Sequence, residues 1–466
     1  MFLIPMRRLF VFPMPLSVNS IKLEIKETAL LALPISLGQL GHVLTGIADY
    51  TMLGHTRPLE MAGATFATSV FFPVMILGLG FGLGLTPLVA HANGAKDEAK
   101  LMDLFRTSVK TNLVLGIVFF GFLFWLGDHL SWFNQPIDVV DTCKAYFVLI
   151  ALSIIPVMLF QSFKTFSDGL KDTTTPMVIS LLSNALNIVL NYLLIFDHGS
   201  FGGMGIEGAG WATLLSRLFM VVTFMFVYWR KKRFQPFFYG VFADVRKFVH
   251  LRGILNIGLP ISAYMFFEVT AFSAATFMMG WIGEDYISAH QAALSLASIS
   301  FVVCMGVGNA GSIRTATFVG EKKLNNLKGV VASVVLVSLC LSLVAAFIFL
   351  LFRDRLPLVF VDANEVEIIG YASVMLLYAA LFQFSDGLQV IFQGLLQGIG
   401  DVKIPSFIAI TSYWCIALPL GYYLAFHTAV GYSGIWVGLT VGLTFSAVLQ
   451  ITRYYYSYKK LMINHF

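Results

Sequence analysis

Two carboxylates lie inside long apolar stretches, where an ordinary membrane-spanning helix would not keep them. Glu268 occurs within LPISAYMFFEVTAFSAATFMM, and Asp386 occurs within YASVMLLYAALFQFSDGLQVIFQG. A charged side chain at the centre of a bilayer costs about 2.5–3.5 kcal/mol even on the mild insertion scales. Membrane proteins that keep such groups generally use them to move an ion, a proton or a charged substrate. These two residues therefore indicate transport.

Asp386 begins a polar stripe along its own apolar stretch. The stripe has four members, each three or four residues after the last: Asp386, Gln389, Gln393 and Gln397. At about 3.6 residues per turn, side chains at this spacing share one face of a helix. Lipid would penalise that face, so we expect it to line a water-filled cavity rather than to form a packed polar seam between helices.

Glu268 lies about two helical turns after Pro260 and one turn after Tyr264. A carboxylate close to hydroxyl groups can bind Na⁺ or a proton. Apolar surroundings favour the uncharged form of a carboxyl group, which suits proton exchange. We therefore expect Glu268 and Asp386 to hold a cation, with Tyr264 beside them. The less favoured alternative is a protonated Glu268 that only bonds to a neighbouring helix.

Polar residues also recur in the first half of the chain. Two predicted helices carry them at helical spacing: Gln39, His42 and Asp49 on one, and Asn184, Asn187 and Asn191 on the other. They predict a second polar site, although simple interhelical hydrogen bonding would also explain them. Arg217 offers a further alternative, in which it pairs with Asp49 and leaves no free carboxylate.

Two other polar positions favour a structural interpretation. Gln161, Thr165, Asp168 and Asp172 share a face with lysines beside them. We interpret this face as a solvated helix end with local ion pairs. His290 could line the cavity, but a single histidine there is more often a structural hydrogen-bond donor.

The composition is that of an integral membrane protein. Of the 466 residues, 58% are hydrophobic and only 12% are charged, whereas soluble domains are about 25% charged. One spanning helix needs about 20 apolar residues, so the length suffices for about a dozen spans. The net charge of +5 lies mostly at helix ends, so we expect no nucleic-acid partner. The four cysteines lack the spacing of a metal site or a disulfide framework.

Twelve apolar stretches stand out, and the charges between them set their orientation. The stretches are 28–50, 63–93, 104–127, 142–166, 175–197, 206–229, 253–281, 286–316, 328–352, 367–396, 403–427 and 432–456. Lys and Arg gather at both termini and after every second stretch, so the positive-inside rule places both termini in the cytoplasm.

The chain also repeats itself at a fixed offset. LPIS begins at Leu33 and again at Leu259, and the same offset of 226 residues relates Gly80 to Gly306 and Lys96 to Lys322. Since 226 residues hold six predicted helices, the two repeats have parallel topology. We predict five segments: a cytoplasmic lead-in 1–24, an N-lobe 25–229, a basic cytoplasmic linker 230–252, a C-lobe 253–457 and a cytoplasmic tail 458–466.

Known catalytic motifs are absent from the sequence. It contains no P-loop, no HExxH and no G-x-S-x-G. We therefore expect no enzyme, although a membrane-embedded transferase stays open as an alternative.

The chain resembles the multidrug and toxin extrusion (MATE) family, over roughly residues 25–455. Three features carry the resemblance: the paired LPIS repeats, the acidic residues in predicted helices 1, 7 and 10, and two longer segments. These segments, LPISAYMFFEVTAFSAATFMMG with ISAHQAALSLASI and QFSDGLQVIFQGLLQGIGDVKIPSF with ALPLGYYLAF, are similar to the NorM-like branch. The resemblance implies an all-α protein of twelve transmembrane helices in two six-helix lobes arranged as a V.

The resemblance also implies cation-coupled antiport of organic cations across the bacterial inner membrane. Glu268 and Asp386 would be the coupling residues of the second lobe, and Asp49, Asn187 and Asn191 would match the polar site of the first. Na⁺ or H⁺ would be the coupling ion with no other cofactor, and we expect a monomer in the lipid bilayer. A lipid-linked oligosaccharide flippase is the main rival, but its cavity should be rich in Arg and Lys.

Overall fold

The computed structural model describes residues 18–197, 203–242 and 249–463. Within these ranges, twelve helices are long and apolar enough to cross a membrane, which confirms the predicted number. They run over Asn19–Gly54, Pro58–Gly94, Glu98–Gly127, Ile137–Gly169, Thr174–Ile195, Gly205–Arg230, Leu251–Ile282, Glu284–Gly320, Leu324–Phe352, Val366–Gly398, Lys403–His427 and Ser433–Ile463. The span 403–427 matches its prediction, and most others extend beyond the apolar stretch at one or both ends.

Contacts divide the chain into two compact units, which we call the first-half unit (residues 37–266) and the second-half unit (residues 1–36 and 267–466). Two long helices belong partly to each unit, namely α1 (Val18–Gly54) and α10 (Leu251–Ile282). The predicted lobe boundaries remain a prediction. Parts of the predicted lead-in, linker and tail, at 1–17, 243–248 and 464–466, lie outside the described residues.

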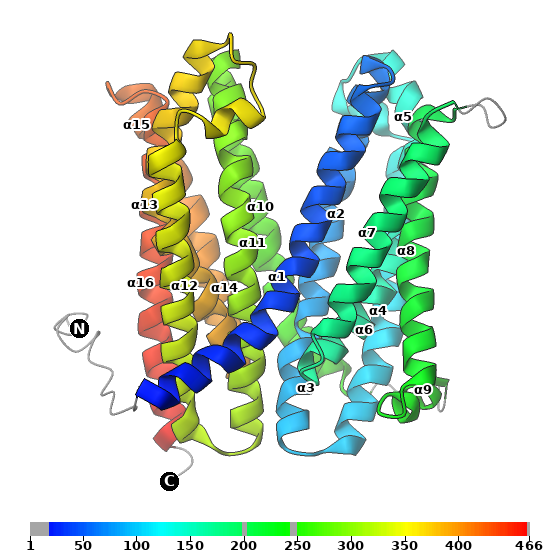
Figure 1. Ribbon diagram of the computed structural model, residues 1–466, viewed down its shortest axis with the longest axis vertical. Helices are drawn as coiled ribbons and strands as arrows, with labels where there is room; N and C mark the ends of the chain where they lie inside the picture. The colour runs from blue at the N-terminus through cyan, green and yellow to red at the C-terminus, as the bar shows by residue number, and fades with distance from the viewer. Residues whose placement is uncertain (1–17, 198–202, 243–248, 464–466) are drawn as a thin grey trace. The chain divides into compact units, whose positions relative to one another are not determined.

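The first-half unit is a helix bundle around an aromatic core (Figure 1). Besides the parts of α1 and α10, it contains α2 (Pro58–Leu83), α3 (Leu85–Gly94), α4 (Glu98–Gly127), η2 (Leu130–Phe133), α5 (Ile137–Leu152), α6 (Ile154–Gly169), α7 (Thr174–Ile195), α8 (Gly205–Arg230) and α9 (Gln235–Phe242). Phe105, Phe163 and Tyr228 pack with ring centroids 5.1–5.5 Å apart. Such offset and edge contacts stabilise buried rings beyond the burial of their area.

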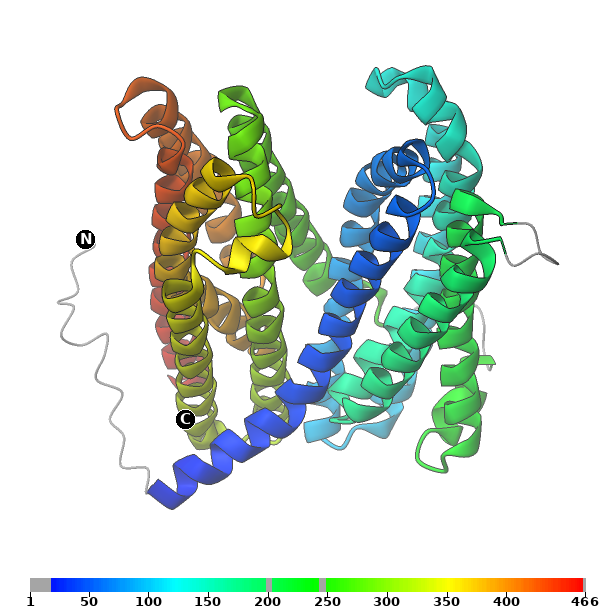
Figure 2. The same cartoon turned by 45° about the horizontal axis from the view of Figure 1, so that its top comes forward.

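The second-half unit is organised around α13 (Val366–Gly398), which contacts α11, α12 and α16 (Figures 1 and 2). Its other elements are α11 (Glu284–Gly320), η3 (Leu324–Asn326), α12 (Leu327–Phe352), η4 (Leu356–Val359), α14 (Lys403–Thr411), the π-helix η5 (Ser412–Ala417), α15 (Leu418–His427) and α16 (Ser433–Ile463). Glycines let α11 and α13 approach closely, because a Cβ at Gly394 would collide with the carbonyl oxygen of Gly308. Small residues at helix contacts are typical of membrane bundles.

The two LPIS segments make equivalent contacts in the two units. Ser36 Oγ donates to the carbonyl of Val303 (3.1 Å), and Ser262 Oγ donates to the carbonyl of Leu77 (2.6 Å). Both members of the second pair differ by 226 from their counterparts, once in each direction along the chain. Each serine also packs on a glycine that would lose this contact with a side chain, Gly306 and Gly80 respectively. The sequence repeat is therefore also a repeat of structure.

Turn conformations repeat at the same offset. Lys96 and Lys322 both adopt a left-handed backbone, with φ of 56° and 61°, and Gly205 and Gly431 do so with φ of 53° and 59°. A lysine rarely adopts this conformation. Its presence at equivalent positions indicates that both repeats end the corresponding helices in the same way.

A buried arginine holds the start of α1 within the second-half unit. Arg314 on α11 donates to the backbone carbonyl of Glu24 (2.9 Å) and to Thr28 Oγ1 (2.6 Å), and it pairs with the Glu24 carboxylate. Thr28 also bonds to Ser333 on α12 at 2.8 Å. An arginine with several acceptors can be buried without an unpaired charge.

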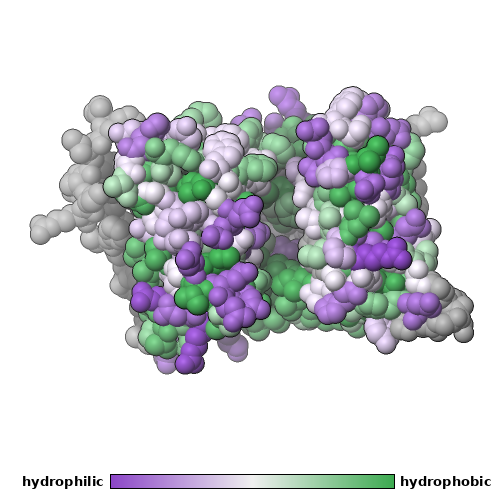
Figure 3. Space-filling model, turned by 90° about the horizontal axis from the view of Figure 1, so that it is seen from above, coloured by the Kyte–Doolittle hydropathy of each residue, from purple (hydrophilic) through white to green (hydrophobic). Residues whose placement is uncertain are grey.

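Polar side chains gather where the helices end. Seen from above, each unit presents hydrophilic residues among hydrophobic ones (Figure 3). This is the distribution expected where helices leave the hydrocarbon region and their loops meet water.

We predict that Gly394→Ala lowers the free energy of unfolding by about 1–3 kcal/mol, because overpacking a tight contact forces the helices apart. Gly370→Ala is a matched control on the same helix, since a Cβ at Gly370 meets nothing within 4 Å. The melting temperatures of both purified variants would test this. Equal melting temperatures would contradict the close α11–α13 packing.

Candidate functional site

Glu268 lies in the middle of α10 and is buried against two side chains of the second-half unit. Tyr413 Oη donates to Glu268 Oε1 at 2.7 Å, and Gln389 Nε2 donates to Tyr413 Oη at 2.7 Å. Gln389 Nε2 also lies 3.4 Å from Glu268 Oε1. The carboxyl group is therefore solvated by protein donors in place of water.

A π-helix brings Tyr413 to this position. The span 403–427 is α-helical at both ends and widens into η5 over Ser412–Ala417. Pro419 follows directly and has no N–H to donate to the carbonyl four residues before it. Such widened turns are frequent at functional sites. Sequence analysis missed Tyr413; the proline within its apolar stretch was the available signal.

Asp386 lies on α13 one turn before Gln389, on the same helix face. It is buried, and it interacts electrostatically with Glu268. The next residue, Gly387, packs on the hydroxyls of Ser338 and Ser342, where a Cβ would lie 2.8 Å from each. The second-half unit thus brings together the two carboxyl groups that the sequence singled out.

A hydrogen-bonded neighbour of Asp386 was also missed. Gln383, one turn earlier on α13, accepts a bond from Ser300 Oγ on α11 (2.7 Å), and its backbone carbonyl accepts one from Ser342 Oγ (3.1 Å). Both serines read as ordinary apolar-helix residues in the sequence, so no signal distinguished them.

The whole α13 stripe is buried inside the second-half unit. Gln389, Gln393 and Gln397 each expose less than a tenth of their surface. The predicted water-filled cavity beside them therefore remains a prediction, to which we return below.

The other predicted residues of the second site lie as follows. Tyr264 is buried one turn before Glu268 on α10, but in the part of that helix that belongs to the first-half unit. His290 is fully buried near the start of α11, 3.2 Å from Thr276 Oγ1, with its ring 5.5 Å from that of Trp436. The roles of both residues remain predictions.

The first-half unit holds a separate polar network. Asn191 on α7 donates to the Asp49 carboxylate on α1 and to Asn187 Oδ1 (3.1 Å), and Asn187 Nδ2 lies 3.5 Å from Ser216 Oγ. Ser183 adds a bond to the carbonyl of Ser216 at 2.7 Å. The structure thus joins all three residues of the predicted first-half site.

Arg217 does not form the ion pair with Asp49 that we considered. Its guanidinium donates to Ser153 Oγ (2.6 Å) and lies 5.4 Å from the ring centroid of Phe71. In the described ranges, Asp49 is instead held by Asn191. Gln39 is half-buried and His42 is exposed, and no hydrogen bond between described residues joins either to this network.

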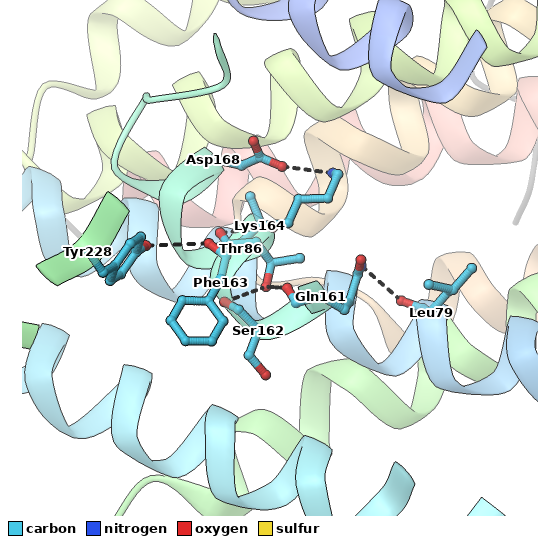
Figure 4. A network of polar contacts seen from close by, with 9 residues as sticks. Leu79, Thr86, Gln161, Ser162, Phe163, Lys164, Asp168 and Tyr228 are labelled. Carbon is cyan, nitrogen blue, oxygen red and sulfur yellow. Dashed lines mark hydrogen bonds and ion pairs between the residues drawn. The ribbon is translucent and has the colours of Figure 1, made fainter. Parts of the chain in front are cut away.

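The α6 stripe was interpreted wrongly as a solvated helix end. Lys164 and Asp168 form a 2.9 Å ion pair whose side chains are only 12% and 5% exposed. Figure 4 shows this pair, and on the same helix Gln161 directed at the backbone carbonyl of Leu79. Burial beneath the neighbouring helices, which the sequence alone could not reveal, makes the pair an internal one.

The oxygen-rich second site could bind a cation without a dedicated metal cluster. Across the described residues, no group of three or more His, Cys, Asp or Glu side chains could hold a metal ion. Two carboxyls with a tyrosine hydroxyl and an amide suit Na⁺, which prefers oxygen ligands, and they equally suit a proton. Na⁺ binding at Glu268 and Asp386 remains a prediction.

The MatE family model matches residues 34–193 and 260–423. The chain belongs to the MatE family. The matched segments begin 226 residues apart (260 − 34), which is the offset of the LPIS repeat.

Curated relatives and solved structures agree with this membership. "Probable multidrug resistance protein NorM" of Xylella fastidiosa is 31% identical over 431 residues, covering 92% of each chain. The protein of the same name from Pasteurella multocida is 30% identical, covering 93% of this chain and 94% of its own. A MOP superfamily transporter from Pyrococcus furiosus matches with a TM-score of 0.84 at 19% identity, over 96% of this chain and 99% of its own. A eukaryotic MATE transporter, AtDTX14, matches with a TM-score of 0.84 at 20% identity, over 96% and 100%.

The identities to the solved structures are low enough that they establish the fold alone. Together with the family match, they confirm a MATE-type all-α membrane protein with twelve candidate spans and two repeats.

We predict that Tyr413→Phe destabilises the protein by about 1–3 kcal/mol, since it removes a hydroxyl shared by two buried polar side chains. Tyr422→Phe, at an exposed position of the same span, is the control and should melt at the wild-type temperature. Thermal unfolding in detergent would measure both. An unchanged melting temperature for Tyr413→Phe would mean that its hydroxyl does not hold the site together.

Proposed function

We propose that this chain is an antiporter that exports organic cations in exchange for inward-moving Na⁺ or H⁺. It would act as a monomer in the bacterial inner membrane, with both termini in the cytoplasm. The positive-inside distribution of Lys and Arg supports this orientation. One chain suffices, since both polar sites lie within it.

The pair of buried carboxyls, Glu268 and Asp386, is the observation that supports coupling. Two carboxyl groups close together in apolar surroundings cannot easily both stay charged and unliganded. A bound cation or proton relieves both the burial and the mutual repulsion. The second-half unit is therefore poised to take up a cation when that cation is abundant and to release it when it is scarce.

The sign of the buried charge supports a cationic cargo. Within the described ranges, Arg314 is tied to Glu24 and Lys164 to Asp168, so these buried basic groups already have counter-charges. An anionic lipid-linked cargo would need uncompensated Arg or Lys. The NorM relatives carry multidrug resistance in their names, in keeping with export of varied small molecules.

Exchange follows if cation and cargo exclude one another. Cation entry from outside would then lower the affinity for cargo, and cargo binding from inside would favour release of the cation. By linkage, the two effects on affinity must be equal in size. A tenfold cation gradient would supply about 1.4 kcal/mol per cation, enough to concentrate cargo about tenfold.

We predict that Glu268→Gln and Asp386→Asn each lose cation-driven ethidium efflux from proteoliposomes, because neither amide can bind a proton or neutralise a bound Na⁺. Na⁺ and pH gradients would be imposed separately. Glu367→Gln is the matched control, as an exposed carboxylate in the first turn of the helix that holds Asp386. Wild-type efflux in the Glu268→Gln variant would sink the assignment.

The same vesicles discriminate the rival functions. Wild-type protein that moves no organic cation under either gradient, but does move a lipid-linked oligosaccharide, would be a flippase. Formation of a covalent product without any gradient would identify a membrane-embedded transferase.

A further inference from the structure

Buried polar atoms without hydrogen-bond partners gather around the second half of α13. They come from four helices of the second-half unit: Ser312 and Thr315 (α11), Gln393 (α13), Ser406 (α14), and Gln450 and Tyr454 (α16). Gln393 is the extreme case, because among the described residues neither its Oε1 nor its Nε2 has a partner, although its side chain is 3% exposed.

Contacts place these groups around one stretch of helix. Gly398 packs directly on Ser312 and Thr315, where a Cβ would lie 2.7 Å from the carbonyl oxygen of one and the Cβ of the other. Phe392, adjacent to Gln393, has its ring 5.7 Å from that of Tyr454. The α16 helix that carries Gln450 and Tyr454 contacts α13 and α14. The unpartnered groups therefore border one region rather than being scattered through the unit.

Such a concentration needs a polar guest. Each buried donor or acceptor left unsatisfied costs about 1–3 kcal/mol, and native proteins rarely keep several together. Buried water usually removes this cost by bonding to about three polar groups at once. Here hydroxyls and an amide from four helices supply those partners.

The region lies on a direct line from the carboxyl site. Gln389, which bonds to the Glu268 site, is followed on the same face by Gln393 and Gln397, each about 6 Å further along the axis. Beyond the end of α13 lies Asp401, which accepts bonds from Arg453 Nε and Ser457 Oγ, both at 2.6 Å. The whole course from Gln389 to Asp401 is about 18 Å long.

We propose that this face of α13 is a hydrated passage, through which the coupling cation leaves Glu268 and Asp386 toward the Asp401 end. The inference rests on the proposed antiport, and it adds an exit route inside the second-half unit. Water held by Gln393 and its neighbours would solvate a moving Na⁺ or relay a proton. Cargo would need no part of this route.

Cysteine labelling tests the hydration without requiring transport. Gln393→Cys would be treated with 2-aminoethyl methanethiosulfonate in nanodiscs, and modification of its peptide followed by mass spectrometry. Leu396→Cys is the matched control, fully buried on the same helix less than one turn away. Because only a hydrated thiol forms the reactive thiolate readily, we expect Gln393→Cys to react at least about tenfold faster. Equal rates would overturn the passage.

A second pair covers the case in which Gln393→Cys fails to fold. Ser406→Cys is nearly isosteric, and Ala409→Cys, buried one turn further along α14, is its control. Ser406→Cys should again be the faster to react, and equal rates would again overturn the proposal.

Transport then tests whether the water serves the cation. Gln393→Met keeps the volume but removes the polar partners, so we expect gradient-driven ethidium efflux to slow about tenfold, equivalent to about 1.4 kcal/mol on the barrier. Equilibrium ethidium binding should not change, and Leu395→Met should behave as wild type. Unchanged efflux would remove the passage but leave the antiport intact. Labelling at Gln393 without any coupled efflux in wild type would instead contradict the proposed function.

Discussion

A carboxyl group within the hydrocarbon region of a membrane has to be hydrogen-bonded, neutralised or bound to a cation. In this protein, two such groups share one unit and much of the surrounding structure serves them. Tyr413 and Gln389 donate to the Glu268 site, and a π-helix supplies the tyrosine from a span that would otherwise be regular. The arrangement satisfies a carboxyl partly and leaves it able to exchange partners, which a rigid structural pair such as Lys164–Asp168 would not permit.

Close helix packing is what keeps this site dry on its lipid side. Glycines on α11 and α13 let the two backbones meet, so the carboxyl groups sit among helices instead of facing lipid. The internal repeat extends the same packing scheme to both units, as the matching serine–carbonyl contacts at Ser36 and Ser262 show. Only the second-half unit places two carboxyl groups together; the first-half network joins one carboxylate, Asp49, to amides and hydroxyls.

Much of this could be predicted from the sequence. The number of spans, the repeat and the residues Glu268, Asp386, Asp49, Asn187 and Asn191 followed from hydropathy, offset and helical spacing. What failed were features that depend on which helix lies against which. Tyr413 reaches Glu268 only through a local change of helix type, and Arg217 turns to Ser153 because α8 packs beside that residue rather than presenting its side chain to Asp49. Burial of the Lys164–Asp168 pair is likewise a tertiary effect.

Competition at equilibrium tests the central claim most directly. Ethidium binding to purified protein in nanodiscs would be measured by fluorescence anisotropy while Na⁺ is varied at fixed pH, and pH at fixed salt. The account predicts that one of the two cations raises the apparent Kd for ethidium, by about tenfold for each tenfold rise in its concentration above saturation. It also predicts that this dependence disappears in Asp386→Asn. A wild-type Kd that responds to neither cation would contradict the account.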